Sequence, residues 1–313
     1  MKDGFDREID YLRVSLTERC NFSCVYCMPN GQDKKQCRDL LTESNYKQII
    51  QIFRELGIDK IRFTGGEPLL SPHLENLIEF SKNLGIQDIA ITSNGQGLSK
   101  NLIRLKEKGL KRVNISLDSL QEKRFKEITK NGEFSEIMAS IVEAQKLGLK
   151  TKINCVLIKG INDDEIVDFL NLTEKCDIDI RFIELMPIGE GVKYEGVNPD
   201  VVLRSIPDVE YFSQQGSNTE GYYQKKGSSG RISLINPISC SFCDHCSRVR
   251  LTSRGTIKLC LHAKEEIDLT KYMTDSKILK EYIINSVLKK PEKHNMKESG
   301  TSSSEKYMYQ IGG

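Results

Sequence analysis

Short runs in which apolar and polar residues alternate recur along the first 184 residues of the chain. In LRVSL, for example, Arg13 shares one face of an extended strand with Ser15, whereas Leu12 and its apolar neighbours lie on the other face. Runs of this kind predict six strands, at Tyr11 to Leu16, Lys60 to Thr64, Asp88 to Ser93, Arg112 to Leu117, Lys150 to Val156 and Asp179 to Glu184. The pattern predicts a sheet with one apolar and one polar face.

Stretches with helical periodicity separate these strands. They predict helices near Glu43 to Leu56, Leu74 to Leu84, Ser99 to Lys108, Glu136 to Leu147 and Asp163 to Cys176, and several of them end near a glycine, as helices prefer. Strands that alternate with helices indicate a parallel βα sheet, either open or curled into a partial barrel.

The alternation stops after Glu184. Residues 187–262 carry Gly, Pro and Ser, with two expected strands around the later cysteines, which indicates an extension packed on the first unit. A helix is expected from about Ser276 to Leu288, and the polar, Ser- and Gly-rich stretch after it predicts a flexible tail. The expected domains are a barrel at 1–186, an extension at 187–290 and the tail at 291–313.

The polar faces of the predicted strands carry many basic residues. A solvated sheet face would give the same alternation, but parallel βα sheets rarely leave a face bare. If the polar face instead lines the interior, Arg and Lys side chains converge on a hollow that suits phosphate oxygens. These residues are Arg13, Lys60, Arg62, Lys152 and Arg181. The loop motifs TGGEP, SNG and SLDS follow the strands, at the ends where active sites of βα barrels gather.

The composition indicates that any anion recognition is local. Lys and Arg number 46 against 44 Asp and Glu, a formal net charge of +2, so no overall field favours nucleic acid or an anionic membrane. The apolar runs are far short of a membrane span, and the acidic start MKDGFDREID lacks the regions of a signal peptide. We therefore expect a cytoplasmic protein with no nucleic-acid or membrane partner. Ten cysteines in that reducing compartment indicate metal or redox chemistry rather than disulfides.

Three cysteines follow the first predicted strand in a CxxxCxxC spacing: Cys20, Cys24 and Cys27. Three thiolates on a four-iron cluster leave one iron without a protein ligand, and such an open position can bind a substrate or cofactor. The alternative is structural zinc, for which Cys37 could supply a fourth thiolate. The spacing, with aromatic Tyr26 before the last cysteine, favours the cluster.

A second triplet comprises Cys243, Cys246 and Cys260. Taken alone, its spacing is typical of structural zinc, with Cys240, His245 or His262 as a fourth ligand. However, SRVR follows Cys246 and puts Arg248 and Arg250 on one face of a predicted strand, which a structural zinc site does not need.

CxxxCxxC followed one βα unit later by GGEP, Gly65 to Pro68, resembles the radical S-adenosylmethionine (SAM) enzymes. The resemblance implies that SAM chelates the open iron through its amino and carboxylate groups, and that its reductive cleavage yields a 5'-deoxyadenosyl radical. It also implies that the SAM pocket is lined by Tyr26, Gly66, Ser116 and Met186. Without the motif, Met186 would be taken for a core residue.

The chain is similar, more specifically, to the GTP 3',8-cyclases of molybdenum cofactor biosynthesis, the MoaA family. The similarity covers nearly the whole chain and is carried by RVSLTERCNFSCVYCMP, KIRFTGGEPLL, TSNG, VNISLDS, KINCVLIKGINDDE, IRFIELMPIG, SFCDHCSRVRLTSRGTIKLC and the terminal IGG. It implies two [4Fe–4S] clusters, with SAM as a cofactor. It also implies an α/β fold, a partial (β/α)6 TIM-type barrel whose C-terminal extension carries the second cluster.

The same resemblance implies a GTP site and assigns residues to it. The second cluster, on Cys243, Cys246 and Cys260, would bind the purine through its open iron. The residues expected to contact GTP are Arg13, Lys60, Arg62, Ser93, Lys152, Arg181, Arg248 and Arg250. Arg13, Arg248 and Arg250 are the candidates for stabilising the intermediate. The terminal Gly312 and Gly313 are expected to reach into the active site, although such an end would ordinarily be called frayed.

Two departures from the family pattern are visible. Ser93 stands where the family more often has Thr, and the segment between Gly189 and Asn236 is short.

The implied reaction is that of a lyase, the conversion of GTP to (8S)-3',8-cyclo-7,8-dihydro-GTP. The radical abstracts the ribose 3' hydrogen, and the resulting carbon radical attacks C8 of guanine. Reduction by one electron and protonation then give the cyclised nucleotide. The implied partners are a low-potential flavodoxin- or ferredoxin-type donor and a downstream cyclic pyranopterin monophosphate synthase, and a homodimer is left open. Two other classes remain: a peptide-modifying radical SAM enzyme with an auxiliary cluster, and a zinc-stabilised binding module without catalysis.

Overall fold

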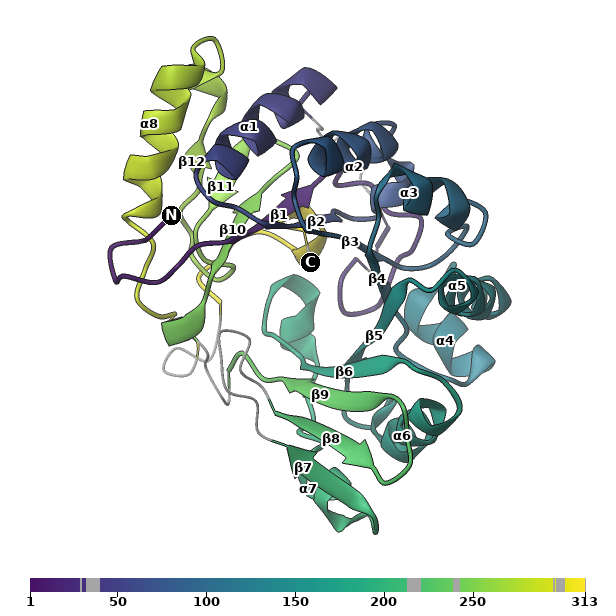
Figure 1. The fold of residues 1–313 in the computed structure, drawn as a ribbon. Helices are drawn as coiled ribbons and strands as arrows, with labels where there is room; N and C mark the ends of the chain where they lie inside the picture. The colour runs from purple at the N-terminus through teal and green to yellow at the C-terminus, as the bar shows by residue number, and fades with distance from the viewer. Residues whose placement is uncertain are drawn as a thin grey trace.

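The structure is a computed structural model that describes residues 1–28, 30–31, 40–212, 221–238, 243–294, 296 and 302–312. Six parallel strands form the centre of its sheet: β1 (Tyr11–Ser15), β2 (Lys60–Thr64), β3 (Asp88–Ser93), β4 (Arg112–Ser116), β5 (Lys150–Leu157) and β6 (Asp179–Glu184). Each of them pairs in parallel with the next along the chain. The sheet curls into a partial barrel (Figure 1).

Helices cover the convex face of this curled sheet (Figure 1). They are α1 (Glu43–Glu55), α2 (Leu74–Asn83), α3 (Leu102–Lys108), α4 (Glu122–Thr129), α5 (Phe134–Lys146) and α6 (Ile166–Lys175). The apolar strand faces meet them, since Leu12 of β1 and Phe53 of α1 are both fully buried in one core. α1 begins after Thr42, whose hydroxyl accepts a hydrogen bond of 3.3 Å from the backbone N–H of Asn45.

The six predicted strands are confirmed, with ends that differ by at most one residue. The five helices predicted between them are confirmed as well, although α6 begins at Ile166 because a 3₁₀ turn, Asp163–Glu165, precedes it. α4 was not predicted. It is eight residues long and has only two apolar side chains, Phe125 and Ile128, so the sequence offers too few apolar positions to define a helical period.

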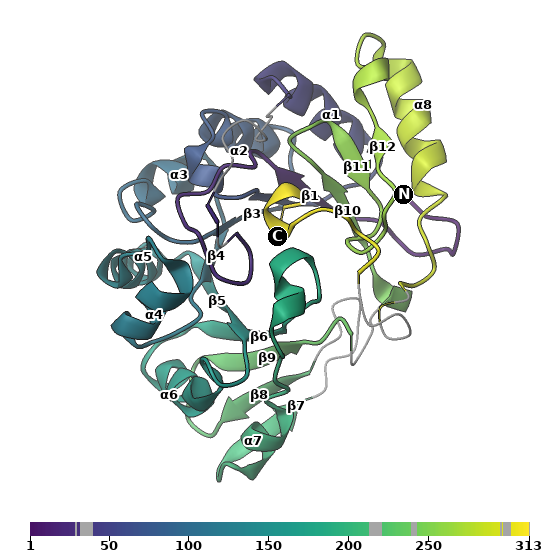
Figure 2. The ribbon, with the colours of Figure 1, turned by 180° about the vertical axis from the view of Figure 1, so that it is seen from behind.

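Strands from the C-terminal part of the chain complete both edges of the six-stranded centre (Figure 2). β9 (Arg231–Ile235) pairs in parallel with β6, and β8 (Tyr222–Lys225) and β7 (Val209–Phe212) follow outward. β10 (Arg248–Leu251) pairs in parallel with β1, and β11 (Thr256–Lys258) and β12 (Ile267–Asp268) follow on that side. The sequence predicted the strands near the later cysteines but not β7 to β9.

The C-terminal part also contributes α7 (Asp200–Ser205) and α8 (Ser276–Val287). α8 packs beside α1, where the Lys280 ammonium lies 2.7 Å from the Glu55 carboxylate. After α8 the chain returns to the mouth of the barrel, where a 3₁₀ turn, η6 (Met308–Gln310), lies close to β1 and β10 (Figure 2). Within the described part of the chain, every helix is too short or too polar to cross a lipid bilayer.

Candidate active site

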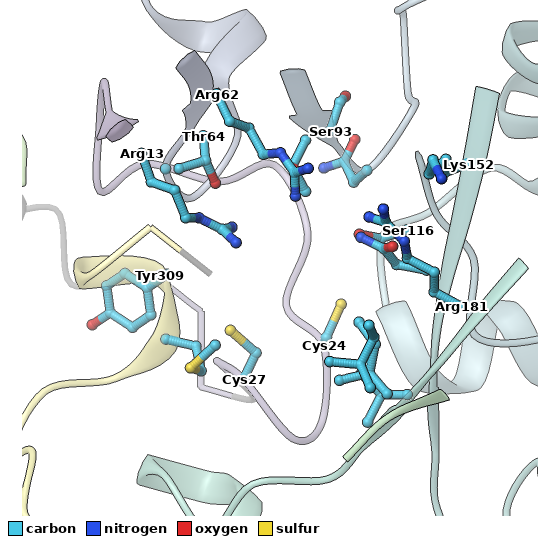
Figure 3. A pocket seen from close by; sticks show the side chains of 18 of the residues that line it. Arg13, Cys24, Cys27, Arg62, Thr64, Ser93, Ser116, Lys152, Arg181 and Tyr309 are labelled. Carbon is cyan, nitrogen blue, oxygen red and sulfur yellow. The ribbon is translucent and has the colours of Figure 1, made fainter. Parts of the chain in front are cut away.

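The concave side of the sheet encloses a cavity of about 520 Å³ that extends from the first residues of the strands to the loops after them. The predicted site residues that line it are Arg13, Cys20, Cys24, Tyr26, Cys27, Lys60, Arg62, Gly66, Ser93, Ser116, Lys152, Arg181, Met186, Arg248 and Arg250. The polar strand faces therefore form an interior and not a solvated surface. Figure 3 shows the guanidinium groups of Arg13 and Arg62 pointing into this space, with the thiols of Cys24 and Cys27 beneath them.

The first cysteine triplet lies in the loop that follows β1. A tight turn presents its thiols, because the carbonyl of Cys24 accepts the N–H groups of Cys27 at 3.0 Å and Met28 at 2.8 Å. Burial raises the pKa of Cys20 to about 11 and that of Cys27 to about 12, and it holds that of Cys24 well above its usual value. Free thiolates are therefore unfavourable here, whereas coordination to a metal deprotonates a thiol outright. The donor set fits a metal cluster.

The residues predicted to line a SAM pocket come from several segments of the cavity wall around this triplet. Tyr26 donates a 2.7 Å hydrogen bond to the carboxylate of Asp118. Burial raises the pKa of Asp118 to about 6, although the hydrogen bonds from the Val156 N–H and from Tyr26 oppose this rise. Gly66 packs so closely on the chain that an added Cβ would overlap the carbonyl of Arg19, so only glycine fits there.

A buried carboxyl connects two of the loop motifs. Glu67 of GGEP accepts hydrogen bonds from the Ser93 hydroxyl at 2.9 Å and the Asn94 N–H at 2.7 Å. Burial raises the pKa of Glu67 to about 7, although these donors and the Leu69 N–H oppose the rise. Ser93 thus lines the cavity, while its hydroxyl is bonded to Glu67 and orients the neighbouring motif.

The other end of the cavity concentrates positive charge. Burial, followed by repulsion from other arginines, lowers the pKa of Arg13 and Arg62, and it lowers that of Arg181 to about 9. The two lysines have carboxylate partners, Lys60 with Asp10 and Lys152 with Asp179, each at 2.6 Å. Burial and Arg181 nevertheless lower the pKa of Lys152 to about 8. A polyanion bound here would relieve this repulsion.

The second cysteine triplet lies behind the arginines of β10. Cys243 and Cys246 form a turn, with 3.1 Å from the N–H of Cys246 to the carbonyl of Cys243, and Cys260 follows β11. These three thiols do not line the cavity, but Cys246 and Cys260 both act on the charge of Arg250, whose pKa burial lowers to about 10. Burial alone would raise the pKa of Cys246, yet Lys290 and Arg248 lower it, so this environment favours a thiolate ligand.

The zinc alternatives of the sequence analysis receive no support from the described residues. Across those residues, no three His, Cys, Asp or Glu side chains are grouped to hold one metal ion, a condition that the cysteines of a four-iron cluster do not have to meet because each binds a different iron. Cys37 and Cys240, proposed as fourth zinc ligands, lie outside the described residues. His262 stacks edge-on against His294, with ring centroids 4.8 Å apart.

The C-terminal tail reaches the cavity through Met308 and Tyr309, and Gly312 lies beside the lining residue Thr64. Tyr309 lines the cavity, and the carbonyl of Gly312 accepts a 2.7 Å hydrogen bond from Arg250. Gly312 has a φ of +71°, and an added Cβ would lie 2.8 Å from Cγ2 of Thr64. Gly313 lies outside the described residues.

Many other lining residues were not predicted, and Tyr11, Arg112 and Arg231 are among them. The Tyr11 hydroxyl is buried with no hydrogen-bond partner among the described residues, and the Arg62 guanidinium lies 5.4 Å from its ring centroid. Arg112 pairs with Asp88 at 2.5 Å, and Arg231 pairs with Asp179 at 3.0 Å. Tyr11 precedes Arg13 by two residues, so strand alternation alone could have identified it.

Comparisons with known proteins show which family the chain belongs to. Residues 14–173 match the family model described as the radical SAM superfamily, and residues 178–296 match the one described as Molybdenum Cofactor Synthesis C. Proteins named GTP 3',8-cyclase are similar over 100% of both chains, with 47% identity for the Clostridium botulinum (strain Okra / Type B1) protein and 46% for the Clostridium acetobutylicum protein. The Alkaliphilus oremlandii protein of the same name is 43% identical, again over 100% of both chains.

Solved structures share the fold at low identity. The crystal structure of Streptococcus suis SuiB bound to precursor peptide SuiA has a TM-score of 0.66 and 14% identity, and the similarity covers 93% of this chain and 67% of that one. SuiB bound to S-adenosylmethionine gives a TM-score of 0.63 and 13% identity over 93% and 68% of the two chains. These likenesses confirm the α/β radical SAM fold, a class that uses SAM and a [4Fe–4S] cluster. Because its relatives named GTP 3',8-cyclase match it over their full length, the chain belongs to the GTP 3',8-cyclase family of the radical SAM superfamily.

Proposed function

We propose that this protein cyclises GTP to (8S)-3',8-cyclo-7,8-dihydro-GTP, the first step of molybdenum cofactor biosynthesis. The observation that carries the proposal is the charge distribution of the cavity. Three buried thiols lie at one end, and a group of arginines with lowered pKa values lies at the other. A nucleoside triphosphate is a ligand that would neutralise those arginines while its sugar extends toward the thiols.

In this proposal, Cys20, Cys24 and Cys27 hold a [4Fe–4S] cluster. Tyr26, Gly66, Ser116 and Met186 line the neighbouring SAM site. The bound cluster and SAM supply a 5'-deoxyadenosyl radical, which takes the ribose 3' hydrogen of GTP. The residues of the chain position the GTP ribose so that its 3' hydrogen lies within reach of the radical, because hydrogen abstraction depends on the relative position of the two groups.

The GTP phosphates are assigned to Lys60, Arg62, Lys152 and Arg181, and Ser93 borders the site. Arg13 pairs in register with Arg250 on the neighbouring strand, and these two arginines together with Arg248 would position the ribose and base as C8 is attacked. We assign these arginines to charge stabilisation and not to proton transfer, because a guanidinium is hard to deprotonate. Gly312, held by Arg250, and Gly313 would close the site at the tail.

Cys243, Cys246 and Cys260 are proposed to hold a second [4Fe–4S] cluster whose open iron binds the guanine. The lowered pKa of Cys246, set by Lys290 and Arg248 against burial, supports thiolate ligands there. The barrel at 1–186, the extension at 187–290 and the tail at 291–313 remain our proposed division of the chain. A low-potential flavodoxin or ferredoxin as donor, a downstream cyclic pyranopterin monophosphate synthase and a cytoplasmic location complete the proposal.

Anaerobic reconstitution tests it. Two clusters correspond to about eight irons per chain. Incubation with dithionite, SAM and GTP should then yield the cyclised nucleotide together with 5'-deoxyadenosine, both measured by chromatography and mass spectrometry. Formation of 5'-deoxyadenosine at the same rate with and without GTP, and with no new nucleotide, would contradict the proposal.

A further inference from the structure

A buried lysine lies among the chain segments that carry the second cysteine triplet. Lys290 follows α8, and only 2% of its surface is exposed. Its ammonium donates to the carbonyl of Arg248 at 2.9 Å and to the carbonyl of Leu259. The side chain also hydrogen-bonds to Cys246. The three N–H donors of the ammonium are thereby used, and they join the start of β10 to the residue before Cys260.

The charge of Lys290 has no carboxylate to balance it. Throughout the described ranges, no Asp or Glu oxygen lies within ion-pair distance of its ammonium, and its partners are two carbonyls and a sulfur. A buried charge is costly unless it is paired. The negative partner that this arrangement leaves for Lys290 is the thiolate of Cys246, together with a cluster that this thiolate would bind.

A neighbouring arginine shows the contrasting case. Arg7 donates to the carbonyls of Cys243 at 2.8 Å, Glu292 at 2.7 Å and Pro291 at 2.7 Å, so it also holds this segment together. Its charge, however, is balanced by Asp3 at 2.6 Å. Arg7 therefore acts as a neutral tether, whereas Lys290 adds an unbalanced positive charge beside the sulfur.

The two triplets consequently lie in opposite electrostatic fields. Besides the other thiols, the charged group that acts on Cys24 and Cys27 is the carboxylate of Asp118. The charged groups that act on Cys246 are Lys290 and Arg248. A cluster at the second triplet would therefore feel positive charge, and one at the first triplet negative charge.

We infer that Lys290 is a positioning residue of the second iron–sulfur cluster, which joins the Cys246 and Cys260 segments and raises the reduction potential of that cluster. The inference rests on the proposed function, since it needs a cluster on Cys243, Cys246 and Cys260. Uptake of one electron adds one negative charge to the cluster, and hydrogen bonds to its sulfurs favour that reduced state. The second cluster thus accepts an electron before the first one does.

The test uses the full chain with Cys20, Cys24 and Cys27 replaced by alanine, so that only the second cluster can form. Reconstituted protein should then hold about four irons per chain. Its midpoint potential is measured by redox titration followed by electron paramagnetic resonance. Three substitutions are made in this background: Lys290→Arg, which keeps the charge, Lys290→Gln, which keeps an N–H donor without charge, and Lys290→Met, which keeps neither.

We expect Lys290→Gln and Lys290→Met to make reduction at least tenfold less favourable, a negative shift of about 59 mV for a one-electron couple, and Lys290→Arg to stay within that range. A purely structural role would move only the methionine variant, because glutamine still donates a hydrogen bond. If the methionine variant does not fold, the glutamine and arginine variants decide.

Unchanged potential in Lys290→Gln, with about four irons still bound, overturns the inference and leaves the proposed function intact. Absence of iron from the background protein itself would instead remove the second cluster from the proposed function, and this inference with it. The two failures are therefore distinguishable.

Discussion

Arg250 donates a 2.7 Å hydrogen bond from its guanidinium to the carbonyl oxygen of Gly312, one residue from the end of the chain. The bond ties the tail to β10, the strand that pairs with β1. Gly312 takes up a left-handed backbone conformation there, close to Thr64 and Ser15. The tail can approach the cavity this closely because the residue has no side chain.

Gly312→Ala should lower cyclisation roughly tenfold. A left-handed non-glycine residue costs about 1–2 kcal/mol, and the new methyl group would also meet Cγ2 of Thr64 at 2.8 Å. The measurement is the rate of cyclised nucleotide formation.

Gly97→Ala is the matched control, because Gly97 has the same φ of +71° but open space around it. It should lower the melting temperature without changing the rate. Equal activities of the two variants would show that the tail has no part in the reaction.

GTP affinity should fall about tenfold between pH 7 and pH 9 through Lys152. Burial and Arg181 lower the pKa of this ammonium to about 8, against the opposing effect of Asp179. Raising the pH through 8 therefore removes a positive charge that phosphate needs, so affinity is full below that pH and is lost above it. Isothermal titration calorimetry with GTP measures the change. Lys152→Arg keeps its charge and should lose less affinity over this range, and the loss that remains should come from Arg181, whose pKa burial lowers to about 9.

Tyr11→Phe should stabilise the ligand-free protein while it weakens GTP binding. The Tyr11 hydroxyl is buried without a hydrogen-bond partner among the described residues, and such a group costs about 1–3 kcal/mol. Removing it should raise the free energy of unfolding by about 1 kcal/mol. The dissociation constant of GTP should rise severalfold, because the hydroxyl faces the arginine-lined end of the cavity.

Tyr46→Phe serves for comparison. The Tyr46 hydroxyl donates to the carbonyl of Ser15 at 3.0 Å, outside the cavity lining. This variant should lose stability and keep its GTP affinity. A loss of stability in Tyr11→Phe as well would show that its hydroxyl has a partner.

Cys24→Ala should remove the iron of the first cluster and abolish SAM cleavage. Cys155→Ala is its control, because the Cys155 thiol is fully buried beneath the sheet and does not line the cavity. It should cost about 1 kcal/mol of stability and leave iron content unchanged. Iron analysis and 5'-deoxyadenosine formation measure both outcomes, and normal iron in Cys24→Ala would refute the assignment.

The central sheet could be predicted because each of its strands shows its own alternation of apolar and polar residues. Strand alternation puts Arg13, Arg62 and Arg181 on one face, and the structure confirms that this face lines the cavity. The same rule could have added Tyr11. Local periodicity says nothing about distant pairing, however, so the parallel contacts of β9 with β6 and of β10 with β1 were not predictable from the strands themselves.

Lys290 shows a second limit of the sequence. A lysine after a helix is ordinarily exposed, and only the folded chain reveals that its partners are the carbonyls of Arg248 and Leu259. The role of Ser93 could not be read from the sequence either, because its hydrogen bond to Glu67 forms only when two loops meet in the folded chain. Contacts between segments far apart in the chain were therefore the part that the sequence concealed.

The pairing of β1 with β10 also bears on how the protein is made. β1 is synthesised long before β10, yet its outer edge can pair with β10, through Tyr11 and Arg248, only after residue 248 has been added to the chain. An unpaired strand edge is a template for aggregation, and pairings between distant segments form slowly. The nascent chain must therefore carry an open edge for most of its translation, which makes it a natural client for chaperones.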